Sequence, residues 1–289
     1  MMRGPILASV ERALGSKVMR SHGVSGGDIN LAYEAELAHG RRVFVKSNDD
    51  APAGMFAAEA RGLAWLGGAK ALRVPAVLAQ GPDFLVLEWI ESARRTPDFD
   101  EQLGRGLAAL HQAKPPSFGL DHDNFIGRLV QANEPRATWP TFYRDQRLQP
   151  QLQLAIDRGL ASPTMRRGFD HLFDDLDELV GPPEPPARLH GDLWGGNLMV
   201  DDRGLPCLID PAVYGGHREV DLAMMRLFGG FSPTAFAAYH EAHPLSPGHE
   251  RRIPLYQLYF LMVHVNLFGG SYVAAVERAL AAVWSGPHA

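Results

Sequence analysis

Three polar side chains in the last third of the chain could together carry out metal-assisted chemistry. Asn197 follows Asp192 by five residues, and Asp210 follows Asn197 by thirteen. The residues between them, 198–209, predict two short strands joined by a turn. A hairpin of this kind would bring Asn197, at its start, beside Asp210, at its end. Two oxygen donors at one hairpin mouth suit a hard cation such as Mg²⁺, and Asp192 on the preceding loop could accept a hydroxyl proton at the same place.

The order of these residues is that of the catalytic loop in protein-kinase-like phosphotransferases. The run His190-x-Asp192-x-x-x-x-Asn197, followed by Asp210, places the base, the amide and the metal-binding acid of that loop in sequence. This pattern predicts Asp192 as the catalytic base and Asn197 and Asp210 as Mg²⁺ ligands. The alternative interpretation is a polar β-turn with solvated carboxylates, and the two flanking strands argue against it.

A kinase-like site also requires nucleotide-binding features in the first part of the chain. A strand lysine must hold the phosphates, and Lys46 ends a predicted strand; a helical acid must hold that lysine, and Glu59 follows thirteen residues later. Backbone amides must cover the phosphates, and the turn containing Gly26, Gly27 and Asp28 lies between two predicted strands. Each feature alone is more often structural, but together they have the correct order. The turn departs from the G-x-G-x-x-G form, which predicts a shorter cradle.

The connection between the two parts of the chain is predicted to hold the adenine of ATP. The strand that begins at Phe84 ends at the polar residue Glu88, and Trp89 and Ile90 follow. In kinase-like folds such a connector presents main-chain groups to a purine, so we expect Glu88 and Ile90 to contribute backbone C=O and N–H groups. An ordinary buried strand running into a loop is the alternative. The expected cofactors are ATP and Mg²⁺.

The elements that must position these residues form two unequal units. The pattern predicts an α+β, protein-kinase-like fold with two lobes: a small β-rich nucleotide-binding lobe, residues 1–90, and a larger helical lobe, residues 91–289, with the catalytic loop and acceptor site. Strands are expected at 30–37, 42–46, 74–78 and 84–87, and helices at 51–66, from 99, at 142–160, 165–180 and from 219 onward, with an extended loop over 118–140.

Composition excludes several other classes of protein. The chain has 289 residues, 46% hydrophobic and 21% charged, which is an ordinary globular mixture rather than a fibre, a coiled coil or a disordered tail. The net charge of −5, without a Lys/Arg block, makes a nucleic-acid partner unexpected. There is no apolar run of about eighteen residues, so no membrane partner is expected. The single cysteine, Cys207, allows no internal disulfide, and we expect a cytoplasmic location.

The sequence resembles the fructosamine kinase (ketosamine kinase) family, relatives of the aminoglycoside and choline phosphotransferases. The runs Asp-Leu-Trp-Gly-Gly-Asn and Gly-His-Arg-Glu-Val-Asp-Leu-Ala are the most specific, whereas His-Gly-Asp…Asn is shared by the whole superfamily. The resemblance covers most of the chain and is carried by residues 25–30, 190–197, 209–224 and 228–231, with 118–127, Trp139 and 147–148 in support.

This resemblance implies an ATP-dependent kinase that acts on ketosamines, which are sugars attached to amines. Phosphorylation at the third sugar carbon would make the adduct unstable and release the amine, a deglycation or repair role. Many family members have a cysteine in the Gly-rich loop that can link two chains. Residues 26–28 here contain none, so a disulfide-linked dimer is not expected and a monomer is.

Several residues near the catalytic loop are candidates for contact with the acceptor. Trp194 could pack its flat face on the sugar or on the alkyl chain of the amine, with Gly195-Gly196 clearing space; the alternative is a Trp that fills the core below the loop. His217 and Glu219 could line the acceptor pocket or brace it. Asp221 is expected to accept hydrogen bonds from the backbone of the catalytic loop.

Two departures from the protein-kinase pattern favour a small-molecule kinase without a regulated loop. Gly191 replaces the arginine beside the catalytic Asp, and Pro211, which lacks an N–H, follows Asp210. The nearest rival function is another small-molecule kinase of this superfamily, acting on an aminoglycoside, choline or a plain sugar. A rival from a different class is a non-catalytic nucleotide-binding regulator, and the complete set of site residues argues against it.

Overall fold

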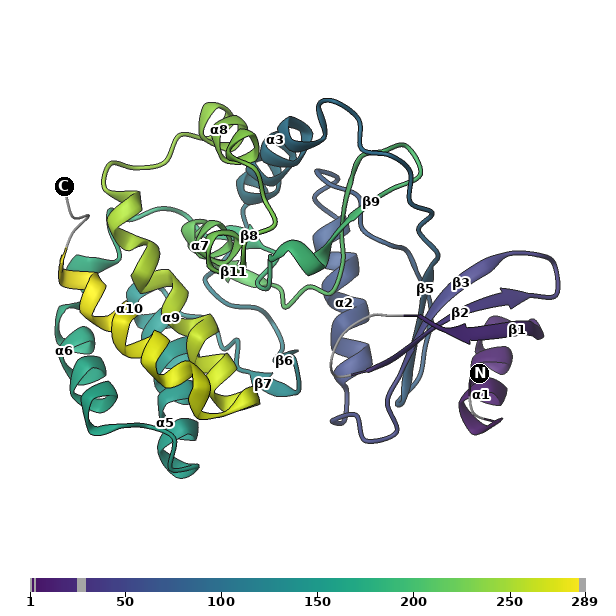
Figure 1. The fold of residues 1–289 in the computed structure, drawn as a ribbon, viewed down its shortest axis with the longest axis horizontal. Coiled ribbons are helices and arrows are strands. Elements are labelled where there is room, and N and C mark those ends of the chain that lie inside the picture. The colour runs from purple at the N-terminus through teal and green to yellow at the C-terminus, as the bar shows by residue number, and fades with distance from the viewer. Residues whose placement is uncertain (1, 3, 25–29, 286–289) are drawn as a thin grey trace.

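A five-stranded antiparallel sheet with the strand order β1-β2-β3-β5-β4 forms the N-terminal lobe (Figure 1). The computed structural model describes residues 2, 4–24 and 30–285. The predicted hairpin is confirmed, whereas β4 begins three residues later than the sequence pattern predicted. The strands are β1 (Val18–Gly23), β2 (Leu31–Leu37), β3 (Arg42–Ser47), β4 (Val77–Gln80) and β5 (Phe84–Glu88).

A helix covers each face of this sheet, and the two-residue period of the strands decides which side chains each helix meets. Val43 and Val45 of β3 face α1 (Gly4–Leu14), whereas Phe44 faces α2 (Met55–Gly67). Because both faces are covered there, the central strands β3 and β5 carry apolar side chains on both sides. The prediction of a mostly β unit omitted α1, and the strand that it required before Gly26, which is β1, was given no bounds.

The C-terminal lobe is mainly helical, as predicted, with three short two-stranded sheets. The predicted loop over 118–140 is wrong in part, because it contains the hairpin of β6 and β7. The helices are α3 (Phe99–Gln112), α4 (Trp139–Phe142), which continues through a π-helical turn into α5 (Gln149–Asp157), α6 (Pro163–Leu179), α7 (Glu219–Phe228), α8 (Pro233–Ala242), α9 (His249–Phe268) and α10 (Val273–Ser285). The paired strands are β6 (Asn124–Ile126) with β7 (Leu129–Gln131), β8 (Ala187–Leu189) with β11 (Tyr214–Gly216), and β9 (Leu198–Val200) with β10 (Pro206–Leu208).

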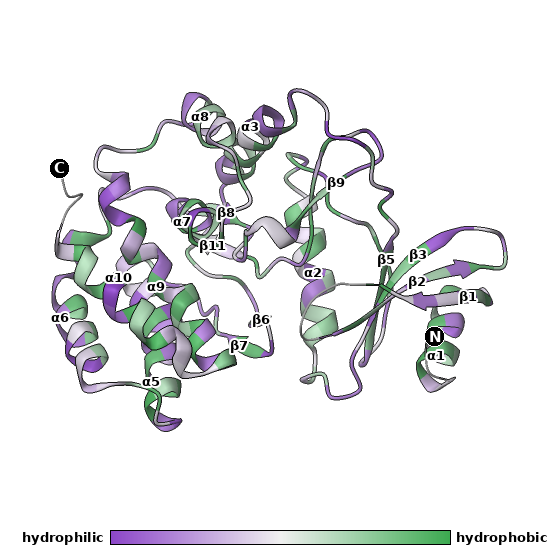
Figure 2. Cartoon of the chain, in the orientation of Figure 1, coloured by the Kyte–Doolittle hydropathy of each residue, from purple (hydrophilic) through white to green (hydrophobic). Residues whose placement is uncertain are grey.

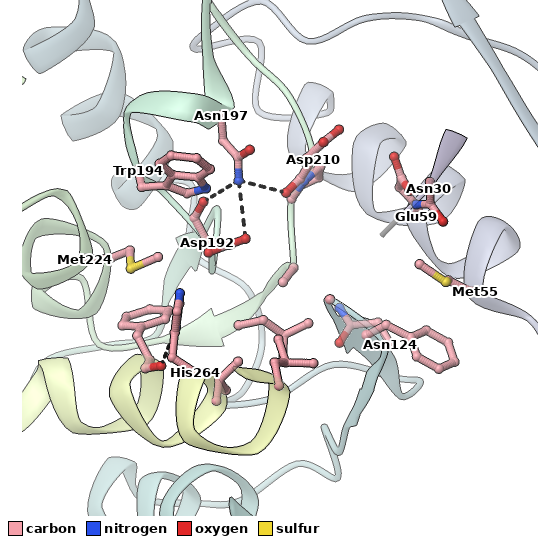
Figure 3. Close-up of a pocket in the computed structure, with 18 of the residues that line it drawn as sticks. Asn30, Met55, Glu59, Asn124, Asp192, Trp194, Asn197, Asp210, Met224 and His264 are labelled. Atoms are coloured by element: carbon pink, nitrogen blue, oxygen red, sulfur yellow. Dashed lines mark hydrogen bonds between the residues drawn. The ribbon is translucent and has the colours of Figure 1, made fainter. Parts of the chain in front are cut away.

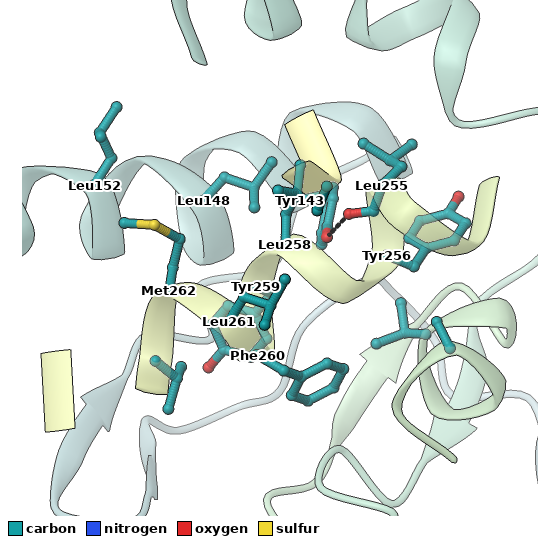
Figure 4. Close-up of a cluster of buried hydrophobic side chains, with 14 of the residues drawn as sticks. Tyr143, Leu148, Leu152, Leu255, Tyr256, Leu258, Tyr259, Phe260, Leu261 and Met262 are labelled. Atoms are coloured by element: carbon teal, nitrogen blue, oxygen red, sulfur yellow. Dashed lines mark hydrogen bonds between the residues drawn. The ribbon is translucent and has the colours of Figure 1, made fainter. Parts of the chain in front are cut away.

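Helix α9 is the centre of the larger core. Its side chains are buried on several sides, and Figure 4 shows Leu258 and Met262 beside Leu148 and Leu152 of the preceding helices. Tyr143 fixes this packing by donating its hydroxyl to the Leu255 carbonyl at 2.8 Å. Figure 2 shows the surrounding helices with mixed apolar and polar faces, as expected of helices that cover a core. Among the described helices, none has both the length and the apolar character needed to cross a bilayer.

The two lobes are joined beside the hairpin of β9 and β10. The linker that follows β5 runs along the turn between β9 and β10, where the Ala93 N–H donates to the Asp201 carbonyl at 3.1 Å. Arg73, just before β4, donates to the Glu88 carboxylate at 2.7 Å and to the Asp201 carboxylate at 3.0 Å, and it also pairs with Asp202. One guanidinium therefore ties the end of β5 to the hairpin of the other lobe.

Candidate active site

The predicted hairpin forms and brings its two ends together. Leu198 pairs with Leu208, and the Ile209 N–H donates to the Asn197 carbonyl at 3.1 Å. Asn197 Nδ2 donates to the Asp192 carbonyl at 2.8 Å, and it contacts an Asp192 carboxylate oxygen at 3.3 Å and the Asp210 carbonyl at 3.4 Å. Figure 3 shows these contacts at the top of a cavity. The amide of Asn197 thus holds the catalytic loop against the hairpin end.

Asp210 adopts a backbone conformation that is uncommon for a residue with a side chain. Its φ is +54°, in the left-handed region that Asp tolerates better than most residues but at some cost in free energy. Such positions persist where the surrounding structure determines them, and they gather at functional sites. Here the conformation directs the Asp210 carboxylate to Lys46 of the other lobe.

Lys46 forms ion pairs with two carboxylates from different lobes. Its Nζ donates to Glu59 Oε1 at 2.8 Å and to Asp210 Oδ1 at 2.5 Å. Lys46 reaches both because it lies on the same face of β3 as Phe44, the face that α2 covers. Burial disfavours the ammonium, but the charges of Asp210 and Glu59 outweigh it and raise the pKa of Lys46, so the residue is charged at neutral pH.

Asp192 lies at the cavity in surroundings that disfavour its charge. Burial, with the nearby carboxylates of Asp210 and Asp221, raises the pKa of Asp192 to about 7, although the hydrogen bond from Asn197 opposes this. A carboxylate with a pKa near neutrality is well suited to accept a proton from a hydroxyl group.

The backbone of the catalytic loop is held from below by Asp221, as predicted. The buried Asp221 carboxylate accepts the N–H groups of His190 at 2.8 Å and Gly191 at 2.9 Å, and a third contact comes from His111 Nε2 at 3.2 Å. Gly191 has φ +83°, and a Cβ there would lie 2.0 Å from the Ala212 carbonyl oxygen. The arginine of protein kinases therefore has no room at this position.

A cavity of about 580 Å³ opens between the lobes and contains this constellation (Figure 3). Trp194 borders it and is 41% exposed, so it does not fill the core below the loop. Its ring lies flat over Gly196, where a Cβ would come within 2.3 Å of the indole. The residues that line the cavity include Asn30, Lys46, Met55, Glu59, Asp192, Trp194, Asn197, Asp210, Phe228, His264, Phe268 and Tyr272.

Comparison with known proteins shows the family to which this chain belongs. A model of the fructosamine kinase family matches residues 3–285. The chain belongs to the fructosamine kinase family. This member is 39% identical over 262 residues to a probable ketoamine kinase of Lactiplantibacillus plantarum, across 89% of this chain and 91% of the relative. It is therefore a kinase, and the predicted family membership is confirmed.

Solved structures confirm the fold predicted for this fructosamine kinase family member. A Thermobifida fusca protein assigned as a fructosamine-3-kinase matches with a TM-score of 0.89 and 43% identity, over 96% of this chain and 98% of that one. The choline kinase LicA of Streptococcus pneumoniae matches with a TM-score of 0.66 at 16% identity, over 96% and 97% of the two chains, which shows a shared fold alone.

The nucleotide-binding predictions have different outcomes in this fructosamine kinase family member. Lys46 and Glu59 lie at the cavity and contact each other, as the sequence order required. Gly26, Gly27 and Asp28 lie outside the described residues, so their predicted role in covering the phosphates stays a prediction.

The predicted hinge residues do not line the cavity. The Glu88 N–H donates to the Ala76 carbonyl at 2.8 Å, within the sheet, and the Glu88 carboxylate is held by Arg73. Trp89 and Ile90 lie in the adjoining linker, and adenine contacts through the Glu88 carbonyl and the Ile90 backbone stay predictions.

The structure does not support His217 and Glu219 as residues that contact the substrate. Neither lines the cavity, and both are buried against α9. The Glu219 carboxylate receives two hydrogen bonds from Arg252, at 2.8 and 2.6 Å, and the His217 ring stacks on Tyr256 with centroids 5.3 Å apart. The sequence left two roles open for these residues, and their contacts with α9 fit the second one, in which they support the structure beside the cavity.

Sequence reasoning missed the aromatic residues at the far end of the cavity. Phe228, His264, Phe268 and Tyr272 line it, and they come from α7, α9 and the turn after α9. A signal was present in the sequence: Phe228 and Phe268 each end a helical stretch and are followed by two glycines. A single exposed apolar residue is ordinary, so this signal becomes informative only because the structure gathers these side chains at one cavity.

Proposed function

We propose that the protein transfers the γ-phosphoryl group of ATP to the 3-hydroxyl group of a ketosamine, such as a fructosamine or ribulosamine. Membership of the fructosamine kinase family supports the acceptor class. The observation that carries the proposal is the convergence of Lys46 and Glu59 from one lobe with Asp192, Asn197 and Asp210 from the other at a single cavity.

The residues at the hairpin mouth fit a Mg²⁺ ion. Because Asn197 Nδ2 makes the contacts to the loop, its Oδ1 has no hydrogen bond from any described residue and is available as a ligand. Asp210 offers a carboxylate oxygen beside it, and such oxygen donors are those Mg²⁺ takes together with substrate phosphates. When bound, the ion would neutralise charge on the transferred phosphoryl group.

The remaining side chains have distinct roles in the proposed reaction. Lys46, positioned by Glu59, would bind the α- and β-phosphates of ATP. Asp192 would take the proton of the acceptor hydroxyl as its oxygen attacks the γ-phosphorus and ADP departs. Trp194 would hold the sugar or the alkyl chain of the amine against its exposed face.

The proposed consequence of this transfer is deglycation. A phosphate on the third carbon is a better leaving group than a hydroxyl, and it lies next to the carbonyl carbon of the ketosamine. Enolisation, with loss of a proton from the amine-bearing carbon, would expel inorganic phosphate from the third carbon and leave an imine that water hydrolyses to the free amine. This role depends on phosphorylation at the third carbon rather than elsewhere on the sugar.

A second candidate is a kinase for choline or an aminoglycoside. The shared fold with a choline kinase allows it, and the aromatic lining of the cavity would suit a quaternary ammonium group. The identity of 16% to that kinase, against 39% to the ketoamine kinase, makes this the less favoured function.

Measurement of ADP release over a panel of acceptors tests both candidates. Ribulosyl-lysine, fructosyl-lysine, choline, an aminoglycoside and free ribulose would each be supplied with ATP and Mg²⁺, with the Asp192→Ala variant as the blank. We expect ADP release with the two ketosamines and a phosphate on carbon three in the product. Activity on choline alone would contradict the proposal, and ATP binding without turnover of any acceptor would indicate a regulator.

A further inference from the structure

Four aromatic residues, Phe228, His264, Phe268 and Tyr272, form what we call the aromatic wall of the cavity. The His264 ring is at its centre, with centroids 4.6 Å from Phe228, 5.0 Å from Tyr272 and 5.4 Å from Phe268. Phe228 and Phe268 remain 37% and 50% exposed although they are apolar. The aromatic wall therefore places three aromatic rings and one imidazole at the cavity.

The surroundings of His264 determine which of its nitrogens carries the proton. Nδ1 lies 2.8 Å from the Phe260 carbonyl oxygen, and because a carbonyl can only accept, Nδ1 must be the N–H donor. Burial lowers the pKa of His264, against a smaller opposing effect of that hydrogen bond, so the ring is neutral at pH 7. Nε2 then holds a lone pair and is a hydrogen-bond acceptor.

This lone pair is available to a ligand. No hydrogen bond joins Nε2 to any residue that the structure describes. Figure 3 shows the His264 ring across the cavity from Asp192, with a ring nitrogen on the side that faces the catalytic loop. A group bound between these two residues would meet a carboxylate at one end and an imidazole acceptor at the other.

The chemistry of the aromatic wall suits a cation that carries N–H groups. The π-faces attract a positive charge, and Nε2 accepts one of its hydrogens. Of the acids among the described lining residues, Glu59 and Asp210 belong to the phosphate and magnesium end of the proposed site, and Asp192 would face the reacting hydroxyl. A neutral hydroxyl could also donate to Nε2 but would gain little from the rings. A secondary ammonium uses both features.

We propose that His264 Nε2 accepts a hydrogen bond from the secondary ammonium of the acceptor, and that the aromatic wall thereby selects amine-linked over oxygen-linked sugars. The inference rests on the proposed function, because in a ketosamine the amine is attached two carbons from the reacting hydroxyl. The same molecule can then offer the hydroxyl to Asp192 and the ammonium to His264. The preference of the enzyme for amine-linked sugars would then come from His264, which is not part of the catalytic loop.

The test compares fructosyl-lysine with an analogue in which an ether oxygen replaces the amine nitrogen. We expect His264→Phe, which keeps a ring but loses the acceptor, to lower kcat/KM for fructosyl-lysine about 10- to 100-fold, mainly through KM. The value for the ether analogue and the KM for ATP should stay within about twofold of the parent enzyme. His264→Gln, whose amide oxygen can accept, should restore part of the preference.

A matched control is His171→Phe, the same substitution at an exposed histidine on α6 that stacks on Trp284 away from the cavity. This variant should leave kcat/KM unchanged for both acceptors. If His264→Phe lowers kcat/KM for both acceptors equally, the ring has only a steric role and the inference is wrong. If it leaves the preference unchanged, the inference is also wrong while the kinase proposal stands. If the parent enzyme releases no ADP with any amine-linked sugar, the proposed function itself fails, and the inference with it.

Discussion

Two aspartates show how their surroundings give one residue type opposite properties. Both are shielded from water, which raises the pKa of a carboxyl group. For Asp221, hydrogen bonds and charge from His111 and the Gly191 N–H overcome burial and lower the pKa. For Asp192, the single hydrogen bond from Asn197 does not overcome the effect of burial, and the pKa rises to about 7. The first carboxylate therefore suits a structural role and the second a proton acceptor.

Replacing Asp192 by alanine should abolish turnover and leave ATP binding largely intact. Loss of a general base lowers a rate by roughly 10²- to 10⁴-fold, whereas Lys46, Asn197 and Asp210, which would hold the nucleotide and the ion in the proposed site, are unchanged. ADP release and the affinity for a fluorescent ATP analogue measure the two effects separately. Asp192→Asn keeps the shape of the side chain and serves as the matched variant; normal turnover in either would contradict the assignment.

Gly191→Ala should destabilise the protein through the backbone. A residue with a side chain costs about 1–2 kcal/mol in the left-handed region, and the clash with the Ala212 carbonyl adds roughly 1–3 kcal/mol. Gly159→Ala is the control, because Gly159 has φ +69° and a Cβ added there would have no atom within 4 Å. Urea unfolding of both variants gives the two costs. If Gly191→Ala and Gly159→Ala lose equal stability, the backbone near Gly191 moves enough to remove the clash with the Ala212 carbonyl oxygen.

At the scale of elements, the hairpin of β9 and β10 depends on the turn that joins its strands. The buried Asp201 carboxylate accepts the backbone N–H groups of Arg203 at 2.9 Å and Leu205 at 2.8 Å, and it receives Arg73 from the other lobe. This turn determines the pairing register, and the register places Asn197 beside Asp210. A residue without any contact to substrate thus sets the geometry of the proposed metal site.

The hairpin should lose stability in acid through Asp201. Burial raises its pKa, but hydrogen bonds from Leu205, Arg73 and Arg203 prevail and lower it to about 2, against 3.8 for a free Asp. A carboxyl group whose pKa is lower in the folded than in the unfolded protein stabilises the fold at pH values above its pKa in the unfolded chain. The contribution of Asp201 to the free energy of unfolding is therefore complete above about pH 5 and is lost as pH falls from about 4 to about 2. It amounts to about 2 kcal/mol at pH 7.

Unfolding free energies of the parent and of Asp201→Asn, measured by urea at pH 7 and pH 3, test this. The parent should be the more stable at pH 7, and the difference should shrink at pH 3. Asp202→Asn on the same turn is the control, since its side chain is 56% exposed. A difference between parent and Asp201→Asn that does not depend on pH would contradict the role of the ionised carboxylate.

At the scale of the whole molecule, the site exists only where the lobes meet. Lys46 and Asp210, 164 residues apart in the chain, contact each other directly. Of the large apolar side chains exposed among the described residues, Trp194, Phe228 and Phe268 all border the cavity. The relative position of the lobes is therefore part of the site.

Arg73→Met should disturb this relative position. The change removes the guanidinium that joins Glu88 to Asp201, so we expect the KM for ATP to rise severalfold while the KM for the acceptor changes little. Stability should fall by about 1–3 kcal/mol, because the buried Asp201 loses a charged partner. Steady-state kinetics and urea unfolding measure both effects.

The control for this variant is Arg105→Met, which removes a guanidinium paired with Glu101 and Glu241 on the surface of α3 and α8. Exposed pairs of this kind contribute little, so its KM values and stability should match those of the parent. If Arg73→Met also leaves the KM for ATP unchanged, the ion pairs at Arg73 do not position the nucleotide lobe.

Much of the fold and the centre of the site could be predicted because they depend on local patterns. Imperfect alternation identified β2, β-branched and aromatic residues identified β3, and an apolar run identified β5. The spacing of Asn197 and Asp210 around a turn predicted their meeting. The helix α1 was missed, and it buries only Ile6 and Val10 fully, so its apolar stripe is a weak signal. The roles of His217 and Glu219 could not be predicted, since either side of that segment could have faced the cavity.

The family, the order of the candidate catalytic residues and the hairpin that joins the proposed metal ligands could be predicted from the sequence, because each shows in runs of residues that are close together in the chain. Which side chains face the cavity depended on how distant segments pack against each other. His217 turns toward α9, whereas Phe228 and His264 meet at the cavity, because the packing of α7 against α9 determines which face of each helix is buried. That packing depends on contacts between segments that no local pattern relates.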